Sequence, residues 1–195
     1  NGGTSLKQNP ITRPIGLEAA CAEIERVCSQ ASLYKRCGLR PPHLILPLDS
    51  GSGRTTFLEY MADSFRKAGV LPFRSGFEDY LEISLDGTLP QLRQAFASID
   101  AAAVYTNRYS NMVALDISPL AQHLSESQLP EFLKNAKRIC EDACVVFFVR
   151  SEPSRNEERL LEKLCEAVDH IQRLAVEPYR QEELCRILEK VLEDR

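Results

Sequence analysis

The residues best suited to do chemistry lie in a small-residue loop, Asp49-Ser50-Gly51-Ser52-Gly53, between an apolar run that ends at Leu48 and a helix-like segment that starts at Arg54. A strand, a glycine-rich loop and a helix in this order form the context of a phosphate-binding loop. Unpaired N–H groups at a helix N-terminus attract anions, and glycines let the backbone come close to them. The spacing therefore predicts a phosphate cradle that consists of Gly51, Ser52, Gly53, Arg54, Thr55 and Thr56.

The match to the phosphate-loop pattern is incomplete. That pattern requires Gly, four residues and then Gly-Lys-Ser/Thr, whereas here Leu48 stands at the first glycine and Arg54 at the lysine. Arginine keeps the cation, but its planar fork is not interchangeable with the point charge of lysine beside a phosphate. Thr55 keeps the hydroxyl that would ligate Mg²⁺. The alternative interpretation is an ordinary tight turn from a strand into a helix.

Hydrophobic patterning predicts the elements that would hold this loop. Apolar runs predict strands at 43–48, 80–85, 112–117, 144–149 and 171–176, and helical periodicity predicts helices at 15–35, 54–68, 88–105, 130–142, 156–168 and 180–192. Strands that alternate with helices predict parallel β-α units and a three-layer α/β fold with about five strands. Ligands of such folds bind at the carboxyl ends of the strands, where the loop begins and where Asp116 ends the third strand.

Composition and charge limit the classes of function. The chain has 195 residues, enough for one sizeable core, and its net charge of −4 gives no support for a broad nucleic-acid-binding surface. No segment is apolar enough for a membrane span, no signal peptide is recognisable, and the seven cysteines form no CxxC pair, which together predict a cytoplasmic protein with reduced thiols. Residues 1–14 are polar and are expected to be an extended lead-in or linker, in a chain excised from a larger protein.

Three further segments carry a family resemblance: Ile15-Gly16-Leu17-Glu18, Gly38-Leu39-Arg40-Pro41-Pro42-His43-Leu44, and Val176-Glu177-Pro178-Tyr179-Arg180-Gln181-Glu182-Glu183-Leu184. Together with the loop they resemble the AAA+ ATPases. They look closest to the bacterial branch that contains the Rubisco-activase-like CbxX proteins and their sporulation-protein-K-like relatives. The resemblance covers residues 14–192 approximately, and its specific parts are the loop and its two flanks.

The resemblance implies a P-loop NTPase core at 15–178 and the start of a helical lid at 179–195, with most of that lid absent. It implies ATP or ADP with Mg²⁺ as the cofactor. Ile15 and Gly16 would border the adenine, Gly51 to Thr56 would wrap the phosphates, and Thr55 and Asp116 would serve the metal.

The departures from the family fall on catalytic positions. The second acidic motif of the family ends in Asp-Glu, but here it reads Asp116-Ile117, and an isoleucine cannot act as a general base. The stretch 165–170, where the family carries its arginine finger, contains no arginine. The polar residue expected after the fourth strand aligns with Arg150 or Ser151, either of which could instead be an ordinary strand-end residue. Asp116 likewise could simply cap the next turn.

These departures predict a degenerate nucleotide-binding domain with weak or absent hydrolysis and no catalytic residue of its own. Protein partners or self-assembly are expected, and nucleic acid is not. Two alternatives stay open: a scaffold of the same fold that binds no nucleotide, and an active ATPase that takes its base and arginine finger from other chains.

Overall fold

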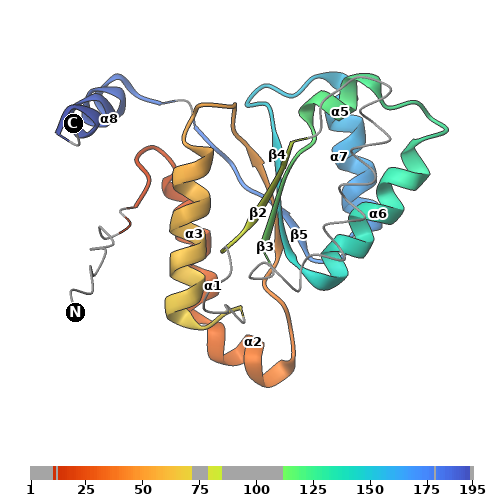
Figure 1. Cartoon of the computed structure of the whole chain (residues 1–195), viewed down its shortest axis with the longest axis horizontal. Coiled ribbons are helices and arrows are strands. Elements are labelled where there is room, and N and C mark those ends of the chain that lie inside the picture. Colours follow the sequence, from red (N-terminus) through yellow and green to blue (C-terminus); the bar gives the residue numbers. More distant parts are fainter. Residues whose placement is uncertain (1–10, 12, 72–78, 85–111, 178, 194–195) are drawn as a thin grey trace, which may run out of the picture.

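A parallel five-stranded sheet forms the centre of the molecule (Figure 1). The computed structural model describes residues 11, 13–71, 79–84, 112–177 and 179–193. The strands are β1 (His43–Pro47), β2 (Leu81–Ser84), β3 (Met112–Asp116), β4 (Cys144–Val149) and β5 (Ile171–Arg173), in the order β2-β3-β4-β1-β5. Each strand expected from the sequence is present and every pairing is parallel, which confirms the α/β fold class.

Helices cover both faces of this sheet. The helices among the described residues are α1 (Glu18–Ser29), α2 (Ala31–Cys37), α3 (Arg54–Ala68), α5 (Ser118–His123), α6 (Leu129–Asp142), α7 (Arg155–Ala167) and α8 (Gln181–Glu193), and α8 lies apart from the sheet. Figure 1 shows α1 and α3 on one face and α5, α6 and α7 on the other. Because side chains alternate along a strand, Leu44 and Leu46 enter the core under α1 and α3, whereas Ile45 enters the core under α6 and α7.

Three sequence predictions differ from the structure in detail. The helix expected over 15–35 is two helices, because the backbone leaves helical geometry at Gln30 (φ −99°, ψ 8°). The Ser29 hydroxyl donates to the Arg26 carbonyl at 2.7 Å, a local bond that competes with helix continuation. The last strand ends at Arg173 rather than at 176, and Ser118 opens a short helix instead of only ending a strand. The expected helix over 88–105 and most of the lead-in lie outside the described residues.

The sheet register brings three strand ends to one edge. Asp116 of β3 lies opposite Phe148 of β4, and the Leu48 amide after β1 donates to the Val149 carbonyl at 2.9 Å. The loop from β1 to α3 leaves the sheet at this carboxyl edge, at the top of the view in Figure 1. Residues that are far apart in the sequence therefore meet beneath this loop.

Candidate functional site

The loop between β1 and α3 has the backbone conformation of an anion cradle. Gly51 and Gly53 have φ of 83° and 90°, in the left-handed region that favours glycine. The Ser52 amide donates to the Asp49 carbonyl at 3.1 Å, which closes the turn. Gly53 is the N-cap of α3 and no side chain caps the helix, so its first N–H groups have no acceptor among the described residues. Such uncapped amides carry positive partial charge toward solvent.

Arg54 points into the protein instead of toward the loop. Its side chain is 9% exposed, its Nε donates to the Leu48 carbonyl at 2.6 Å, and one terminal nitrogen donates to Asp116 Oδ2 at 2.5 Å. The guanidinium also lies over the Phe148 ring, 4.7 Å from its centroid. These contacts pair the positive charge of Arg54 with a carboxylate below the loop, as a buried charge requires.

Asp116 is engaged through both carboxylate oxygens. Its Oδ2 accepts from Arg54, and its Oδ1 accepts from the Ser118 amide at the start of α5, at 3.1 Å. The second contact matches the turn-capping interpretation of Asp116. The neighbouring Ile117 is fully buried in the core under α5, α6 and α7. The position at which the sequence resemblance implies a catalytic glutamate therefore holds an apolar side chain in the core.

Tyr179 lies against Gly16 and Gly53. Its hydroxyl donates to the Ser52 carbonyl at 2.9 Å, and its ring lies so close to Gly16 that a Cβ at that position would overlap the ring. A Cβ at Gly53 would lie 3.3 Å from the Tyr179 hydroxyl oxygen. Burial, with Glu183 and Glu18 nearby, raises the pKa of Tyr179, so the phenol stays a donor at neutral pH. Sequence reasoning noted this tyrosine only as part of a family segment and not as a site residue.

The residues after β4 hold the loop from the other side. The Ser151 hydroxyl and amide donate to the Asp49 carboxylate at 2.5 Å and 3.2 Å, and these bonds hold the pKa of Asp49 below its usual range. Arg150 donates to the fully buried Glu157 at 2.5–3.1 Å. Burial of Glu157 opposes ionisation, but the bonds from Arg150 and Ser154 outweigh it and lower the pKa of Glu157 to about 2. Both polar residues after β4 thus have partners within the protein.

The residues predicted from the sequence gather at the carboxyl edge of the sheet. Gly16 meets the loop through Tyr179, Ile15 precedes it and is half-buried, and the Thr55 and Thr56 side chains are exposed on the first turn of α3. A cavity of about 460 Å³ opens beside Gly16, and its walls include Leu17, Ala175, Val176 and Arg180. This cavity lies where the predicted adenine-bordering residues enter α1.

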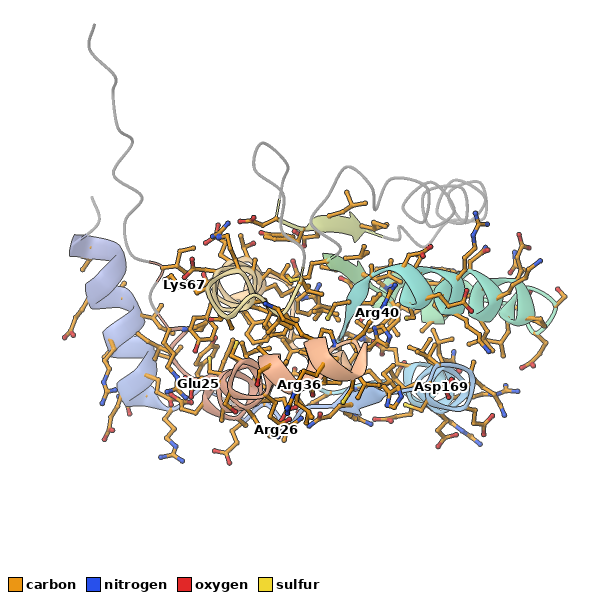
Figure 2. All side chains as sticks on the ribbon, turned by 90° about the horizontal axis from the view of Figure 1, so that it is seen from below. Glu25, Arg26, Arg36, Arg40, Lys67 and Asp169 are labelled. Atoms are coloured by element: carbon orange, nitrogen blue, oxygen red, sulfur yellow. The ribbon has the colours of Figure 1, made fainter. Side chains whose placement is uncertain are left out.

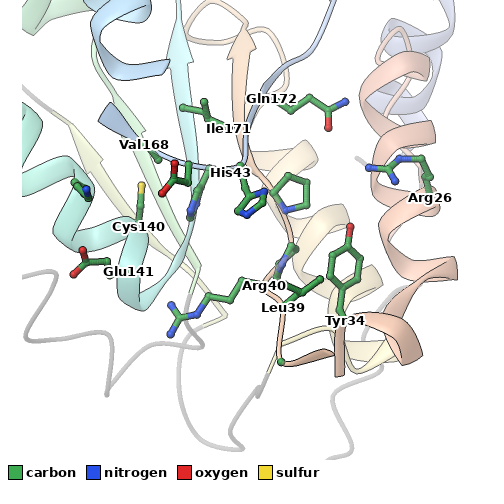
Figure 3. A pocket seen from close by; sticks show the side chains of 16 residues that line it. Arg26, Tyr34, Leu39, Arg40, His43, Cys140, Glu141, Val168, Ile171 and Gln172 are labelled. Atoms are coloured by element: carbon green, nitrogen blue, oxygen red, sulfur yellow. The ribbon is translucent and has the colours of Figure 1, made fainter. Parts of the chain in front are cut away.

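A second cavity, of about 740 Å³, lies at the opposite edge of the sheet and includes none of the predicted site residues (Figure 3). Its wall includes His43, whose Nδ1 accepts from the Val145 amide at 3.2 Å and whose pKa is lowered to about 4, mainly by burial. Figure 2 shows charged side chains of both signs around this end of the molecule: Glu25, Arg26, Arg36, Arg40, Lys67 and Asp169. This mixture forms no single-sign surface.

Solved structures with a similar fold include three DNA-handling or nucleotide-complexed proteins. They are the Aeropyrum pernix ORC1 protein in complex with DNA (19% identity, TM-score 0.53), the A. pernix ORC2 protein in ADPNP-ADP complexes (18%, 0.52) and the Thermotoga maritima RuvB Holliday junction branch migration motor (14%, 0.51). These alignments cover 97%, 95% and 92% of this chain and 52%, 54% and 52% of the respective structures. The chain therefore spans about half the length of these proteins.

The chain has the fold of the AAA+ P-loop ATPases. With identities of 14–19%, the likeness extends to the fold, and it does not select the CbxX branch from other AAA+ branches. No protein-family model matches the chain, and no curated protein matches its sequence. Across the described ranges of this AAA+ fold, none of the helices combines the length and apolar character needed to cross a membrane.

Proposed function

We propose that this AAA+-fold chain binds a nucleoside di- or triphosphate, ATP or ADP, at the loop between β1 and α3, with weak or absent hydrolysis. The observation that carries the proposal is the uncapped N-terminus of α3, which follows two left-handed glycines at the carboxyl edge of a parallel sheet. The ADPNP-ADP complexes of the similar ORC2 protein support a nucleotide as the anion. The cavity beside Gly16 is the proposed place for the base, with Gly16 at its border and Ile15 one residue before it.

Hydrolysis is expected to be weak because the described residues of the site offer no unengaged proton acceptor for an attacking water. Ile117 is apolar and fully buried, and the carboxylates nearest to the loop, Asp49 and Asp116, are already engaged as acceptors. A general base must reach the water and be free to take its proton. We therefore propose that the nucleotide acts as a structural or switching ligand of a larger, cytoplasmic bacterial protein. The sequence segments favour the CbxX and sporulation branch for that protein.

Charge reversal on the first turn of α3 tests the proposal. Thr56→Glu places a carboxylate at the helix N-terminus, where it stabilises the free helix slightly but repels phosphate. Thr56→Gln is the matched neutral control. For a ligand at about 100 times its Kd, binding adds about 2.7 kcal/mol to stability and raises Tm by about 5–10 °C in a chain of this size. We expect ATP and ADP to raise the Tm of the wild type and of the glutamine variant, but not of the glutamate variant.

The control also separates a loss of binding from a loss of folding. Because Thr56 is exposed and a helix N-terminus favours negative charge, the glutamate variant should melt at the wild-type temperature or slightly above it without ligand. Equal ligand shifts in both variants would place the nucleotide elsewhere. No shift of the wild type with either nucleotide at millimolar concentration would reject nucleotide binding.

A scaffold that binds no nucleotide is the second candidate, and two observations favour it. Arg54 is paired with Asp116, and Tyr179 lies against Gly16 and Gly53, so the chain itself fills part of the site. In addition, α8 exposes Leu184, Leu188 and Leu192, which recur every four residues along one side of the helix. A protein partner would account for that apolar stripe. The absence of any ligand-induced Tm shift, together with a partner or self-association lost on Leu188→Glu, would favour the scaffold.

A further inference from the structure

We infer that the Arg54–Asp116 ion pair takes the place of a divalent cation, so that the ligand of this site is a nucleoside polyphosphate free of Mg²⁺. This inference rests on the proposed function, because it specifies the form in which the nucleotide binds. The sequence alone suggested Thr55 and Asp116 as ligands of Mg²⁺. The contacts of these residues do not fit that role.

The Asp116 carboxylate is already paired with a cation, the Arg54 guanidinium. Each of its oxygens accepts a hydrogen bond, at 2.5 Å from Arg54 and at 3.1 Å from the Ser118 amide. Mg²⁺ requires oxygen ligands at about 2.0–2.1 Å in near-octahedral geometry. A dication at that distance from Asp116 would lie within a few ångströms of the guanidinium, and like charges that close repel strongly in a partly buried site. Mg²⁺ could therefore bind Asp116 only after Arg54 had left.

Arg54 is held by groups from three parts of the chain. Its Nε donates to the Leu48 carbonyl at 2.6 Å, its terminal nitrogen donates to Asp116 on β3, and its guanidinium lies over Phe148 on β4. Arginine cannot lose its proton in a protein, so the side chain cannot become neutral to admit the metal. If the Arg54 side chain left the site, the Leu48 carbonyl would lose its hydrogen-bond donor and the Phe148 ring would lose its contact with the guanidinium.

The other acidic groups of this edge do not supply a replacement. Asp49 is engaged by the Ser151 hydroxyl and amide, and Glu157 is engaged by Arg150 and by the Ser154 amide. Within the parts of the chain that the structure describes, no three His, Cys, Asp or Glu side chains converge as they would around a metal ion. The exposed Thr55 hydroxyl is too weak a ligand to hold Mg²⁺ alone. The groups of the loop that can bind a phosphate are therefore its backbone amides.

The consequence is a preference for nucleotide that carries no metal. A nucleotide complexed with Mg²⁺ would bring its dication toward Arg54, whereas the free nucleotide presents only anionic oxygens to the amides of α3. Mg²⁺ should then weaken binding by converting the ligand into a less suitable form. This behaviour is the opposite of what the sequence resemblance implies.

Calorimetric titration of the whole chain with ATP and ADP tests the inference, once in excess EDTA and once in millimolar Mg²⁺. We expect binding to be tighter in EDTA, with a Kd at least about threefold lower than in Mg²⁺. A smaller difference, or tighter binding with Mg²⁺, overturns the inference but leaves the proposed function intact. An absence of binding in both buffers overturns the proposed function and this inference with it.

A variant of Arg54 gives a second, independent test of the effect of Mg²⁺ on nucleotide binding. Arg54→Met removes the cation that pairs with Asp116, so the Asp116 carboxylate becomes available. We expect Mg²⁺ to improve nucleotide binding by this variant by at least about threefold. Arg159→Met, which breaks an exposed ion pair with Glu126 away from the loop, is the control and should behave as the wild type. Mg²⁺ independence in Arg54→Met would show that the guanidinium does not decide the metal requirement.

Discussion

The stability of variants of Arg54 and Asp116 tests whether these two side chains form the buried ion pair beneath the loop. Asp116→Asn removes the negative charge but keeps an oxygen for the Ser118 amide. The guanidinium then stays buried at 9% side-chain exposure with the Leu48 carbonyl and the Phe148 ring as its remaining partners. Arg54→Met removes the opposite charge and keeps an apolar stem over Phe148. The double variant carries neither charge.

The expected magnitudes follow from the exposure of the two partners. Breaking a buried pair by removing one partner costs about 3–5 kcal/mol, because an uncompensated charge is left. The Asp116 side chain is 20% exposed, so water relieves part of that cost. We therefore expect Asp116→Asn to destabilise by about 2–4 kcal/mol, or about 5–15 °C in Tm for a chain of this size. Arg54→Met should cost about 1–3 kcal/mol because the remaining carboxylate keeps the Ser118 amide and contact with water.

The double-mutant cycle measures the coupling. We expect the double variant to be about as stable as Arg54→Met alone, which gives a coupling energy equal to the cost of Asp116→Asn, about 2–4 kcal/mol. Urea denaturation followed by far-ultraviolet circular dichroism gives the free energies of unfolding. The matched control is the exposed pair Arg159–Glu126, at 59% and 72% exposure, for which the same cycle should give less than about 1 kcal/mol.

Two results would refute this reasoning. Single-variant costs that add within about 0.5 kcal/mol would show that the two side chains are not paired in solution. A loss of less than about 1 kcal/mol in the free energy of unfolding of Asp116→Asn would show that the guanidinium finds another partner or reaches solvent. In either case Arg54 would be available to the loop, and the proposal of metal-free binding would lose its basis.

Three further predictions concern other parts of the molecule. Burial lowers the pKa of His43 to about 4, so between pH about 6.5 and 4 the unfolded chain binds a proton that the folded chain does not bind. The free energy of unfolding of the wild type should therefore fall as the pH is lowered through that range. In His43→Asn this decrease should be absent. Because the pKa of Glu157 is lowered to about 2, its contribution is complete above pH about 4.5 and should be lost as the pH falls toward 2. Glu157→Gln should remove this dependence and cost about 1–3 kcal/mol at neutral pH. Gly16→Ala should cost about 2–4 kcal/mol in urea denaturation, since φ is +76° and the new Cβ would overlap the Tyr179 ring. Tyr179→Ala should recover only the part due to overlap.

Local patterns were sufficient to predict most of the fold. The unbroken apolar run at 144–149 is a fully buried strand, as expected, because a central parallel strand is covered on both faces. Gly69 ends α3 as expected, because glycine adopts the left-handed conformation of a helix C-cap without strain. The break at Gln30 was missed because it depends on a side-chain bond of Ser29 that the apolar periodicity does not reveal.

The direction of the site side chains was decided by tertiary structure alone. Arg54 and Asp116 are 62 residues apart, Asp49 and Ser151 are 102 apart, and Tyr179 and Ser52 are 127 apart. The residue types of the loop determine that its backbone can present amides to an anion, because glycine conformation and helix termini are local properties. Whether Arg54 faces that anion or a carboxylate depends on the order of the strands, which places β4 beside β1 and β3, with Asp116, next to β4. Strand order is set by the packing of the whole sheet and not by any one segment.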